Sequence, residues 1–195
     1  MAVSDLLPSG SLIRKLWVGE AKLYCNHLLR LDPQSRRDRF GEDASNDSIR
    51  EHVGACFGRG AILHGFFIVG MLRGAAELRP VGGSLSKRAD AALSVERPWQ
   101  SYGVGSALLE RTLLTARNRR IKWLHMACLA NNLRMQQLAR KFAADLSVDF
   151  ESAVATVQAS RPTPLSVIRE VMADGHAVAA AMLEIQSSFV RPPSA

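Results

Sequence analysis

The segment Gln100–Ser106, QSYGVGS, constrains the fold most strongly, because it joins a strand-like run to a helical pattern. The apolar run ADAALSV (89–95) precedes it and the Leu-rich pattern ALLERTLLTA (107–116) follows. Two glycines at such a junction let the backbone approach another group closely. The first N–H groups of a helix lack partners within the helix and lie at its positive end, so the junction suits a phosphate. An ordinary turn explains the glycines as well, and both interpretations stay open.

Two familiar phosphate loops do not fit the residues that follow. A Walker A loop ends in Gly-Lys-Ser/Thr, whereas Gly105 is followed by Ser106 and Ala107. A dinucleotide-binding fingerprint needs a third glycine where this chain has Leu108, and the strands upstream do not alternate with helices. A loop that presents several backbone N–H groups to one diphosphate remains.

Hydrophobic periodicity predicts a mixed α/β domain with a central sheet. The expected elements are a strand at 11–17, a helix at 20–32, a short turn after Asp32-Pro33, a helix at 48–57, strands at 61–69, 72–80 and 89–95, a helix at 107–116, a strand at 121–129, a helix at 131–143, two strands within 144–159, and a last helix at 164–185. Strand 121–129 is apolar on both sides, which predicts that both of its faces are covered. We expect turns at Gly82 and Gly83, a helix interrupted at Gly175, and a loose tail at 191–195.

Composition limits the classes of protein. A chain of 195 residues with 47% hydrophobic residues predicts one globular domain. Cys25, Cys56 and Cys128 are odd in number and far apart, and the histidines lack ligand spacing, so we expect neither disulfides nor a metal site. No apolar run is long enough for a membrane span, and the N-terminus lacks the features of a signal peptide. We therefore expect no membrane partner and a cytoplasmic location.

The net charge of +7 favours partners that carry phosphate, either nucleic acid or a phosphorylated cofactor. A nucleic-acid-binding sheet would carry aromatic residues interleaved with Arg and Lys. Aromatic residues make up 6% of the chain and are dispersed, so no nucleic-acid partner is expected.

The glycine loop resembles the acetyl-CoA loop of the GCN5-related N-acetyltransferase (GNAT) family, whose pattern is Gln/Arg-x-x-Gly-x-Gly/Ala. The match falls on Gln100, Gly103 and Gly105, after a strand and before a helix. The resemblance covers roughly residues 11–158 in element order, and its specific motifs lie between Ala89 and Phe142.

A second motif of this family is a helix opened by Asn, with apolar residues three and six positions later and then a basic residue. Asn132, Met135, Leu138 and Lys141 have this spacing. The resemblance implies a mostly antiparallel sheet whose fourth and fifth strands splay apart, with 11–158 as the acetyltransferase domain and 159–195 as a helical extension.

The resemblance also implies acetyl-CoA as the cofactor. The backbone of Leu93 and Val95 would pair with the pantetheine amides, Asn132 would hydrogen-bond the cofactor near its reactive end, and Met135 would line the channel or simply pack in the core. The complete predicted cofactor site is Leu93, Ser94, Val95, Gln100, Ser101, Tyr102, Gly103, Val104, Gly105, Ser106, Asn132 and Met135. Arg134 and Arg140 are candidates for the outer phosphates or solvated helix residues.

Acetyl transfer to an amine needs a base, because a free alkyl amine has a pKa near ~10. The family pattern Ala-Glu-x-Ala-x-x-Val is matched by residues 89–95, which makes Asp90 the first candidate base. Asp90 is one methylene shorter than glutamate and would need a bridging water, or it is simply a polar residue at the strand entrance. Glu77 is the second candidate and Glu96 a further alternate, whereas His125 is expected to be a packed core histidine.

Many relatives place a tyrosine, as proton donor, where this chain has Ala139. Tyr24 or Tyr102 would have to replace it, or solvent would assist; Tyr102, within the loop, fits a lid better. The predicted function is acetyl transfer from acetyl-CoA to a primary amine within a ternary complex. The alternative is a non-catalytic acyl-CoA-binding or regulatory module.

The acceptor is a small molecule or a protein lysine. The stretch LRLDPQSRRDRFG (29–41) is similar to one near the start of domains that modify protein lysines. Arg36, Arg37 and Arg39 would instead favour an acceptor with a carboxylate or phosphate. A homodimer would form through the terminal strands or the added helix.

Overall fold

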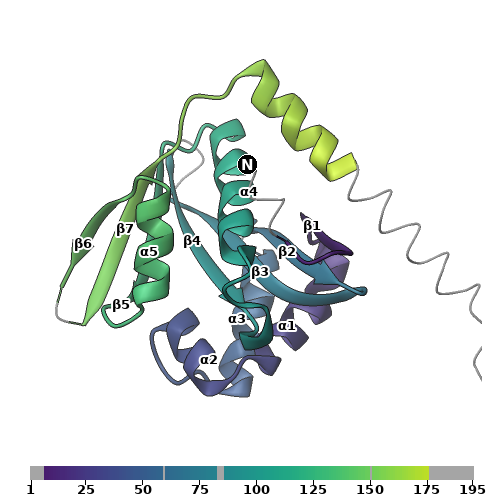
Figure 1. Cartoon of the computed structure of the whole chain (residues 1–195), viewed down its shortest axis with the longest axis vertical. Coiled ribbons are helices and arrows are strands. Elements are labelled where there is room, and N and C mark those ends of the chain that lie inside the picture. Colours follow the sequence, from purple (N-terminus) through teal and green to yellow (C-terminus); the bar gives the residue numbers. More distant parts are fainter. Residues whose placement is uncertain (1–6, 59, 83–85, 150, 176–195) are drawn as a thin grey trace, which may run out of the picture.

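The computed structural model describes residues 7–58, 60–82, 86–149 and 151–175, and in them a seven-stranded sheet carries helices on both faces (Figure 1). The strands are β1 (Ser11–Lys15), β2 (Ile62–Ile68), β3 (Met71–Val81), β4 (Arg88–Val95), β5 (Trp123–Leu129), β6 (Asp145–Val148) and β7 (Ser152–Gln158). The helices are η2 (Val18–Glu20), α1 (Ala21–Arg30), α2 (Pro33–Phe40), α3 (Asn46–Gly58), η3 (Arg97–Trp99), α4 (Val104–Asn118), α5 (Leu133–Lys141) and a further helix at 164–175. The predicted mixed α/β class is confirmed.

The strand order is β1-β2-β3-β4-β5-β7-β6, and every neighbouring pair except β4 and β5 is antiparallel. The parallel pair β4–β5 is matched only where Arg88–Asp90 lies beside Trp123–His125. Both strands continue beyond this point without pairing to each other, and Figure 1 shows them diverging. The predicted splay of the fourth and fifth strands is therefore confirmed.

Each face of the sheet has its own apolar core. Helices α1 and α3 place Leu28 and Ile49 against Leu63 of β2 on one face. On the other face, α4 packs Leu109 against Leu124 of β5, in a cluster that also includes side chains of α5 and β7. A third cluster under the start of α4 contains Phe66, Ile68, Ala76, Val104 and Leu108. The start of α4 is thus anchored from below by buried side chains.

The residues after Asp32 form a helix of 8 residues, where the sequence predicted only a short turn. Asp32 caps this helix by accepting the backbone N–H of Ser35 at 3.2 Å, Pro33 occupies its first turn, and Gly41 ends it with a φ of 81°. These are strong start and stop signals for a helix. Helix α2 packs against both β4 and β5, at the opening between them.

Strand β5 is covered on one face only, which corrects the prediction of a strand covered on both. Leu124 and Met126 are fully buried, but His125 is half-buried and Ala127 is exposed. Helix α2 lies beside this second face and does not close it. His125 is therefore not a packed core histidine; its Nδ1 lies 3.1 Å from the Thr156 hydroxyl on β7.

The helix at 164–175 is attached to the domain by polar contacts. Glu170 accepts hydrogen bonds from Thr115 and Asn118, both at 2.7 Å, and Asp174 pairs with Lys15 at 3.0 Å.

Several predictions fall outside the described residues. They are the part of the last helix after the expected interruption at Gly175, as far as residue 185, the turn residue Gly83 and the tail at 191–195. Gly82 has a φ of 89°, as a turn glycine should. No helix in the described ranges has the length and apolarity that crossing a membrane requires.

Leu108→Ala should lower the free energy of unfolding by about 2–5 kcal/mol, because the fully buried Leu108 side chain supports the start of α4 and its removal leaves a cavity. Urea denaturation of the variant and the parent chain measures the difference. Leu165→Ala is the matched control, since Leu165 is 65% exposed and its truncation should change stability little. Equal stability of all three proteins would contradict the assigned core.

Candidate functional site

A pocket of about 430 Å³ opens where β4 and β5 separate. It is bounded by α2, the end of β4, the glycine loop, the end of β5 and one side of α5 along its whole length. The lining residues predicted from the sequence are Leu93, Ser94, Val95, Gln100, Ser101, Gly103, Gly105, Ser106, Asn132, Arg134 and Met135. Segments from four separate parts of the chain thus meet around one cavity.

Two predicted loop residues do not line the pocket, Tyr102 and Val104. Tyr102 is 55% exposed, and the Val104 side chain is buried in the core beneath α4. Only the backbone of Val104 can therefore serve a ligand in the pocket.

The glycine loop turns through two left-handed residues, Ser101 with a φ of 67° and Gly103 with a φ of 77°. Gly103 is the N-cap of α4, so the N–H groups of Val104, Gly105 and Ser106 begin the helix and have no acceptor within it. A Cβ atom added to Gly105 would approach only Leu138, at an ordinary 3.5 Å. Protein packing therefore does not require a glycine at 105, which leaves room beside these N–H groups for another molecule.

The free edge of β4 faces the same pocket. The N–H of Glu96 bonds the carbonyl of Arg73 on β3 at 2.9 Å. Backbone groups alternate along a strand, so those of Leu93 and Val95 point the other way, towards the gap. Since β5 pairs with β4 only as far as Asp90, these groups meet no strand there. A molecule with amide groups could add to this edge as a strand does.

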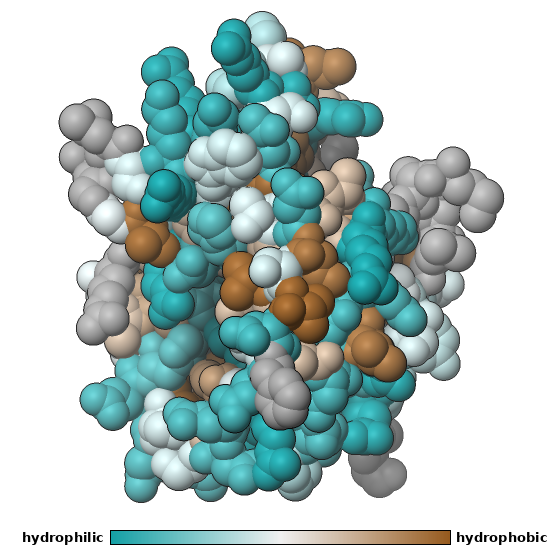
Figure 2. All heavy atoms as spheres, turned by 90° about the vertical axis from the view of Figure 1, so that its left-hand side faces the viewer, coloured by the Kyte–Doolittle hydropathy of each residue, from teal (hydrophilic) through white to brown (hydrophobic). Residues whose placement is uncertain are grey.

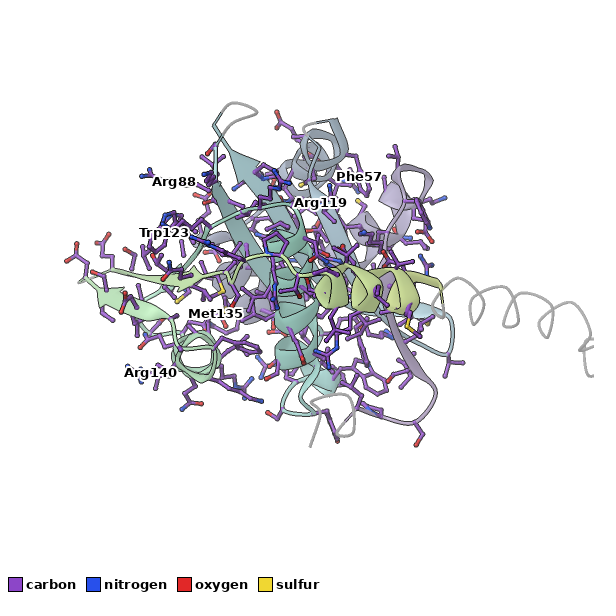
Figure 3. The ribbon with its side chains drawn as sticks, turned by 90° about the horizontal axis from the view of Figure 1, so that it is seen from above. Phe57, Arg88, Arg119, Trp123, Met135 and Arg140 are labelled. Carbon is purple, nitrogen blue, oxygen red and sulfur yellow. The ribbon has the colours of Figure 1, made fainter. Side chains whose placement is uncertain are left out.

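Two cations flank the loop, Arg134 and Lys141, both on α5. Arg134 donates to the Gln100 side-chain oxygen, and Lys141 donates to the Ser106 hydroxyl at 3.2 Å. The sequence motif includes Lys141 but gave it no part in the cofactor site, whereas the structure places it at the pocket. Arg140 does not line it: Figure 3 shows its side chain on the outer side of α5. At the opposite end of the gap, Figure 3 shows Arg88 and Trp123 near each other, where the strands still pair.

Polar side chains bridge the walls of the pocket. The Gln100 amide nitrogen donates to the carbonyl of Val95 at 2.9 Å and to the hydroxyl of Ser35 on α2 at 3.2 Å. The Asn132 side chain caps α5 by accepting the N–H of Met135 at 3.0 Å. Its amide nitrogen is the group left to serve a ligand.

Neither a protein-family model nor the sequence of a curated protein matches the chain. Solved structures do match in fold. The GNAT domain of S. lividans PAT superposes with a TM-score of 0.65 at 19% identity, over 75% of this chain and 89% of that one. A putative acetyltransferase from Salmonella typhimurium, YncA with its cofactor acetyl-CoA, gives 0.59 at 14% identity, over 80% and 97%. RimL, a ribosomal L7/L12 alpha-N-protein acetyltransferase in complex with coenzyme A, gives 0.60 at 16% identity, over 78% and 96%.

The chain has the GNAT fold. The resemblance found between Ala89 and Phe142 is thus confirmed at the level of fold. A fold alone does not assign the chemistry, which depends on the side chains around the pocket.

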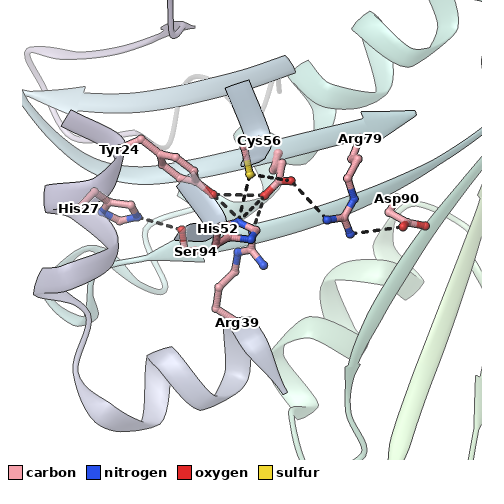
Figure 4. A network of polar contacts seen from close by, with 9 residues as sticks. Tyr24, His27, Arg39, His52, Cys56, Arg79, Asp90 and Ser94 are labelled. Atoms are coloured by element: carbon pink, nitrogen blue, oxygen red, sulfur yellow. Dashed lines mark hydrogen bonds and ion pairs between the residues drawn. The ribbon is translucent and has the colours of Figure 1, made fainter. Parts of the chain in front are cut away.

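Neither carboxylate predicted to act as the base lines the pocket of this GNAT fold. Asp90 lies at the apex of the gap, opposite His125, with its side chain 44% exposed and 3.5 Å from Arg79. Glu77 is buried on β3, whereas Arg79 and Asp90 lie together further along the sheet (Figure 4). Glu77 accepts hydrogen bonds from Arg39 at 2.6 Å and His52 at 3.1 Å, so its oxygens are engaged by protein donors.

Glu77 is held in its ionised form. Burial alone would raise its pKa, but the hydrogen bond from His52 and the charge of Arg39 outweigh burial and bring the pKa to about 2. Such a carboxylate is a poor proton acceptor at neutral pH. Its role in this structure is to anchor Arg39, which lines the pocket.

His52, Cys56 and Glu77 bring three potential metal ligands within 4.8 Å of one another. Burial and the Glu77 charge raise the pKa of the Cys56 thiol to about 12, so the thiol is protonated and donates to Glu77 at 3.3 Å. The Arg39 guanidinium in contact with Glu77 further opposes a cation. The arrangement is explained by hydrogen bonds.

Of the positions predicted to donate a proton or to bind the acceptor, the tyrosines, Ala139 and the arginines lie outside the pocket, with the exception of Arg39. Tyr24 is buried beside Glu77, where burial raises the pKa of its hydroxyl, and Ala139 is buried against α4 and β5. Arg36 and Arg37 do not line the pocket; Arg37 pairs with Asp43 at 2.6 Å. Arg39 is thus the one member of this arginine group at the pocket.

Replacing Glu77 by Gln should reduce the acid sensitivity of the protein. The folded pKa of about 2 is below the ordinary value of 4.5, so ionised Glu77 contributes stability above pH ~4.5 that is lost as the pH falls towards 2. The parent chain should lose on the order of 3 kcal/mol more than Glu77→Gln across this window, although the variant is less stable at pH 7 because Arg39 loses its partner.

Denaturant unfolding at several pH values between 2 and 7 measures this difference, with Glu151→Gln as an exposed control. Parallel pH profiles of the parent chain and Glu77→Gln would show that Glu77 is not held by Arg39 and His52.

Proposed function

We propose that the chain is an acetyl-CoA-dependent N-acetyltransferase that transfers an acetyl group to a primary amine within a ternary complex. The observation that carries the proposal is the pocket at the gap between β4 and β5, where the free edge of β4 and the first N–H groups of α4 meet. The GNAT fold and neighbours solved with acetyl-CoA or coenzyme A support it.

The loop residues fit the diphosphate of the cofactor. The N–H groups of Val104, Gly105 and Ser106 would donate to phosphate oxygens, and the positive end of α4 favours their charge. Lys141 and Arg134 supply full positive charges at the same place. Gly105 leaves the space that close approach requires.

The edge of β4 fits the pantetheine arm, whose amide groups can bond the backbone of Leu93 and Val95. The Val95 carbonyl already accepts from Gln100 and has a second lone pair for another donor. Met135 and Leu138 provide apolar surface for the methylene groups of the arm. The thioester of the bound cofactor supplies the acetyl group, while the residues of this chain position the acceptor and move its proton.

The acceptor would enter beside α2, over the open face of β5. Ser35, Asp38 and Arg39 line this side of the pocket. A carboxylate at 38 favours a cationic amine, whereas Arg39 is engaged by Glu77. A small amine and a protein lysine both satisfy these contacts.

The alternative, a non-catalytic acyl-CoA-binding module, draws support from the missing proton donor. Among the residues that the structure describes, no tyrosine lines the pocket, and Asp90 could act there only through water. A binding module and an enzyme would share the cofactor contacts and differ in turnover.

A homodimer remains a prediction. Figure 2 shows the side of the molecule formed by β6, β7 and α5, where apolar side chains gather near the middle of a mostly hydrophilic face. Val148 and Val154, on the terminal strands, are exposed.

Gly105→Glu should weaken acetyl-CoA binding by about 100-fold or more, because the new carboxylate would occupy and repel the diphosphate position. Isothermal titration calorimetry with acetyl-CoA measures this. Gly54→Glu is the matched control: residue 54 is exposed on α3 and a Cβ there meets nothing within 4 Å. Equal affinities of the parent chain and Gly105→Glu would remove the cofactor assignment.

Release of the coenzyme A thiol in a panel of small amines and lysine peptides should show turnover with at least one acceptor class. The measurement separates enzyme from binding module, because the pocket brings donor and acceptor together only if an amine fits beside α2. Tight acetyl-CoA binding without turnover of any amine would favour the binding module.

A further inference from the structure

A histidine of α1 joins two polar residues at the end of β4 in a row of three hydrogen-bonded side chains, one of which, Ser94, lines the pocket. The Ser94 hydroxyl on β4 lies 2.9 Å from Nε2 of His27 on α1, a contact drawn in Figure 4. His27 Nδ1 lies 3.2 Å from the carboxylate of Glu96, directly after β4. This is the order of groups, hydroxyl to imidazole to carboxylate, that moves a proton in many acyl-transfer sites.

The surroundings of Glu96 determine where the protons lie. Although burial raises its pKa, hydrogen bonds from His27, Arg73 and Arg30 bring it to about 2, so Glu96 is ionised and can only accept. His27 Nδ1 therefore carries a proton and donates it to Glu96. Burial keeps His27 neutral by lowering its pKa, which leaves Nε2 free to accept the Ser94 O–H.

The position of Ser94 connects this line to the pocket. Neighbouring side chains alternate along β4, so Leu93 and Val95 pack towards α4 while Ser94 is turned towards α1. Ser94 lines the pocket on the side where α2 contributes Asp38 and Arg39. His27 is fully buried, and among the residues described Ser94 both contacts it and lines the pocket.

The geometry points to a proton relay, in which Ser94 takes the proton of the attacking amine and passes its own to His27, with Glu96 as the charge partner. The inference rests on the proposed acetyl transfer and adds the base that Asp90 and Glu77 do not supply. Ser94 would be the group that touches the substrate, and His27 and Glu96 act through it.

The amine nitrogen bonds the thioester carbonyl carbon, and the nitrogen proton passes to Ser94 Oγ as the Ser94 proton passes to His27 Nε2. The carbon–sulfur bond then breaks, and the thiolate takes a proton back from His27 through the same hydroxyl. Amine and thioester become amide and free thiol, and the relay returns to its first state. The return path replaces the proton donor that is missing at Ala139.

The charges around His27 favour a relay over a nucleophilic serine. Glu96 stabilises a transient imidazolium, but burial and the nearby positive charges of Arg30 and Arg39 lower the pKa of His27 and weaken it as a base. Forming an alkoxide at Ser94 needs a strong base. The nitrogen of an amine that has attacked a carbonyl carries a positive charge and is acidic, so a weak base at the right distance is sufficient.

The test uses Ser94→Ala, Ser94→Thr and His27→Gln, with an acceptor found in the amine panel. Ser94→Ala should lower kcat by about 100-fold or more, and its residual rate should increase steadily with pH as solvent takes over proton removal. Ser94→Thr retains the hydroxyl and should recover most of the rate. His27→Gln should match Ser94→Ala, and the double variant should be no slower than either single variant, since the two residues act as one unit.

Three controls keep the outcomes distinct. Acetyl-CoA affinity, measured by calorimetry, should stay within about 2-fold of the parent chain in each folded variant, because the cofactor would pair with the backbone of Leu93 and Val95 and not with the side chain of Ser94 or His27. Ser147→Ala, on the exposed strand β6, should leave kcat unchanged. Mass spectrometry of the parent chain after acetyl-CoA alone should show no acetyl group on the Ser94 peptide.

An unchanged kcat in Ser94→Ala would refute the relay alone. An acetylated Ser94 that transfers its group to the amine would replace it with a nucleophilic serine, and joint loss of cofactor affinity and kcat would make Ser94 structural. Failure of the parent chain to turn over any amine would refute both the proposed function and the relay.

Discussion

The structure depends on the place where β4 and β5 stop pairing. Three residue pairs hold the strands together, and after Asp90 and His125 the hydrogen-bonding groups of β4 face a gap. Unpaired backbone groups away from water are costly, so a strand edge of this kind needs water, a side chain or a ligand as its partner. In this chain Gln100 satisfies one carbonyl, that of Val95, and the rest of the edge opens into the pocket. The pocket and the glycine loop beside it both follow from this interruption of the sheet.

One buried and one partly buried ion pair fix the first helices against the sheet around this gap. Arg39 on α2 contacts Glu77, and Arg30 on α1 contacts Glu96 at 2.8 Å. Removing one partner of such a pair leaves an uncompensated charge, so these contacts specify one arrangement of α1 and α2 more than they add net stability. They place α2 at the opening and hold His27 over Ser94. The same contacts that position the wall of the pocket thus set the charge state of the groups behind it.

The sequence predicted the order of elements and most of the pocket, because the local signals were strong. The glycine loop lay between a clear strand and a clear helix, and Asn132 capped α5 as its motif required. Burial was harder to predict: Ala127 and His125 are in an apolar strand, yet whether a helix covers their face depends on the distant α2. Candidate bases failed to appear in the pocket for a related reason. Alternation along β3 and β4 turns Glu77 towards α1 and α3, where Arg39 engages it, and no local pattern shows this.

The hydroxyl, imidazole and carboxylate line could not be found from spacing at all. His27 and Ser94 are 67 residues apart in the chain and meet only because α1 packs on the sheet at β3, next to β4. The most direct test of the account is backbone amide hydrogen exchange, residue by residue, with and without coenzyme A. Exchange should slow by about 10-fold or more at Leu93, Val95, Gly105 and Ser106 when coenzyme A binds. Saturated binding with unchanged exchange at all four amides would contradict the claim that the open edge of β4 and the start of α4 hold the cofactor.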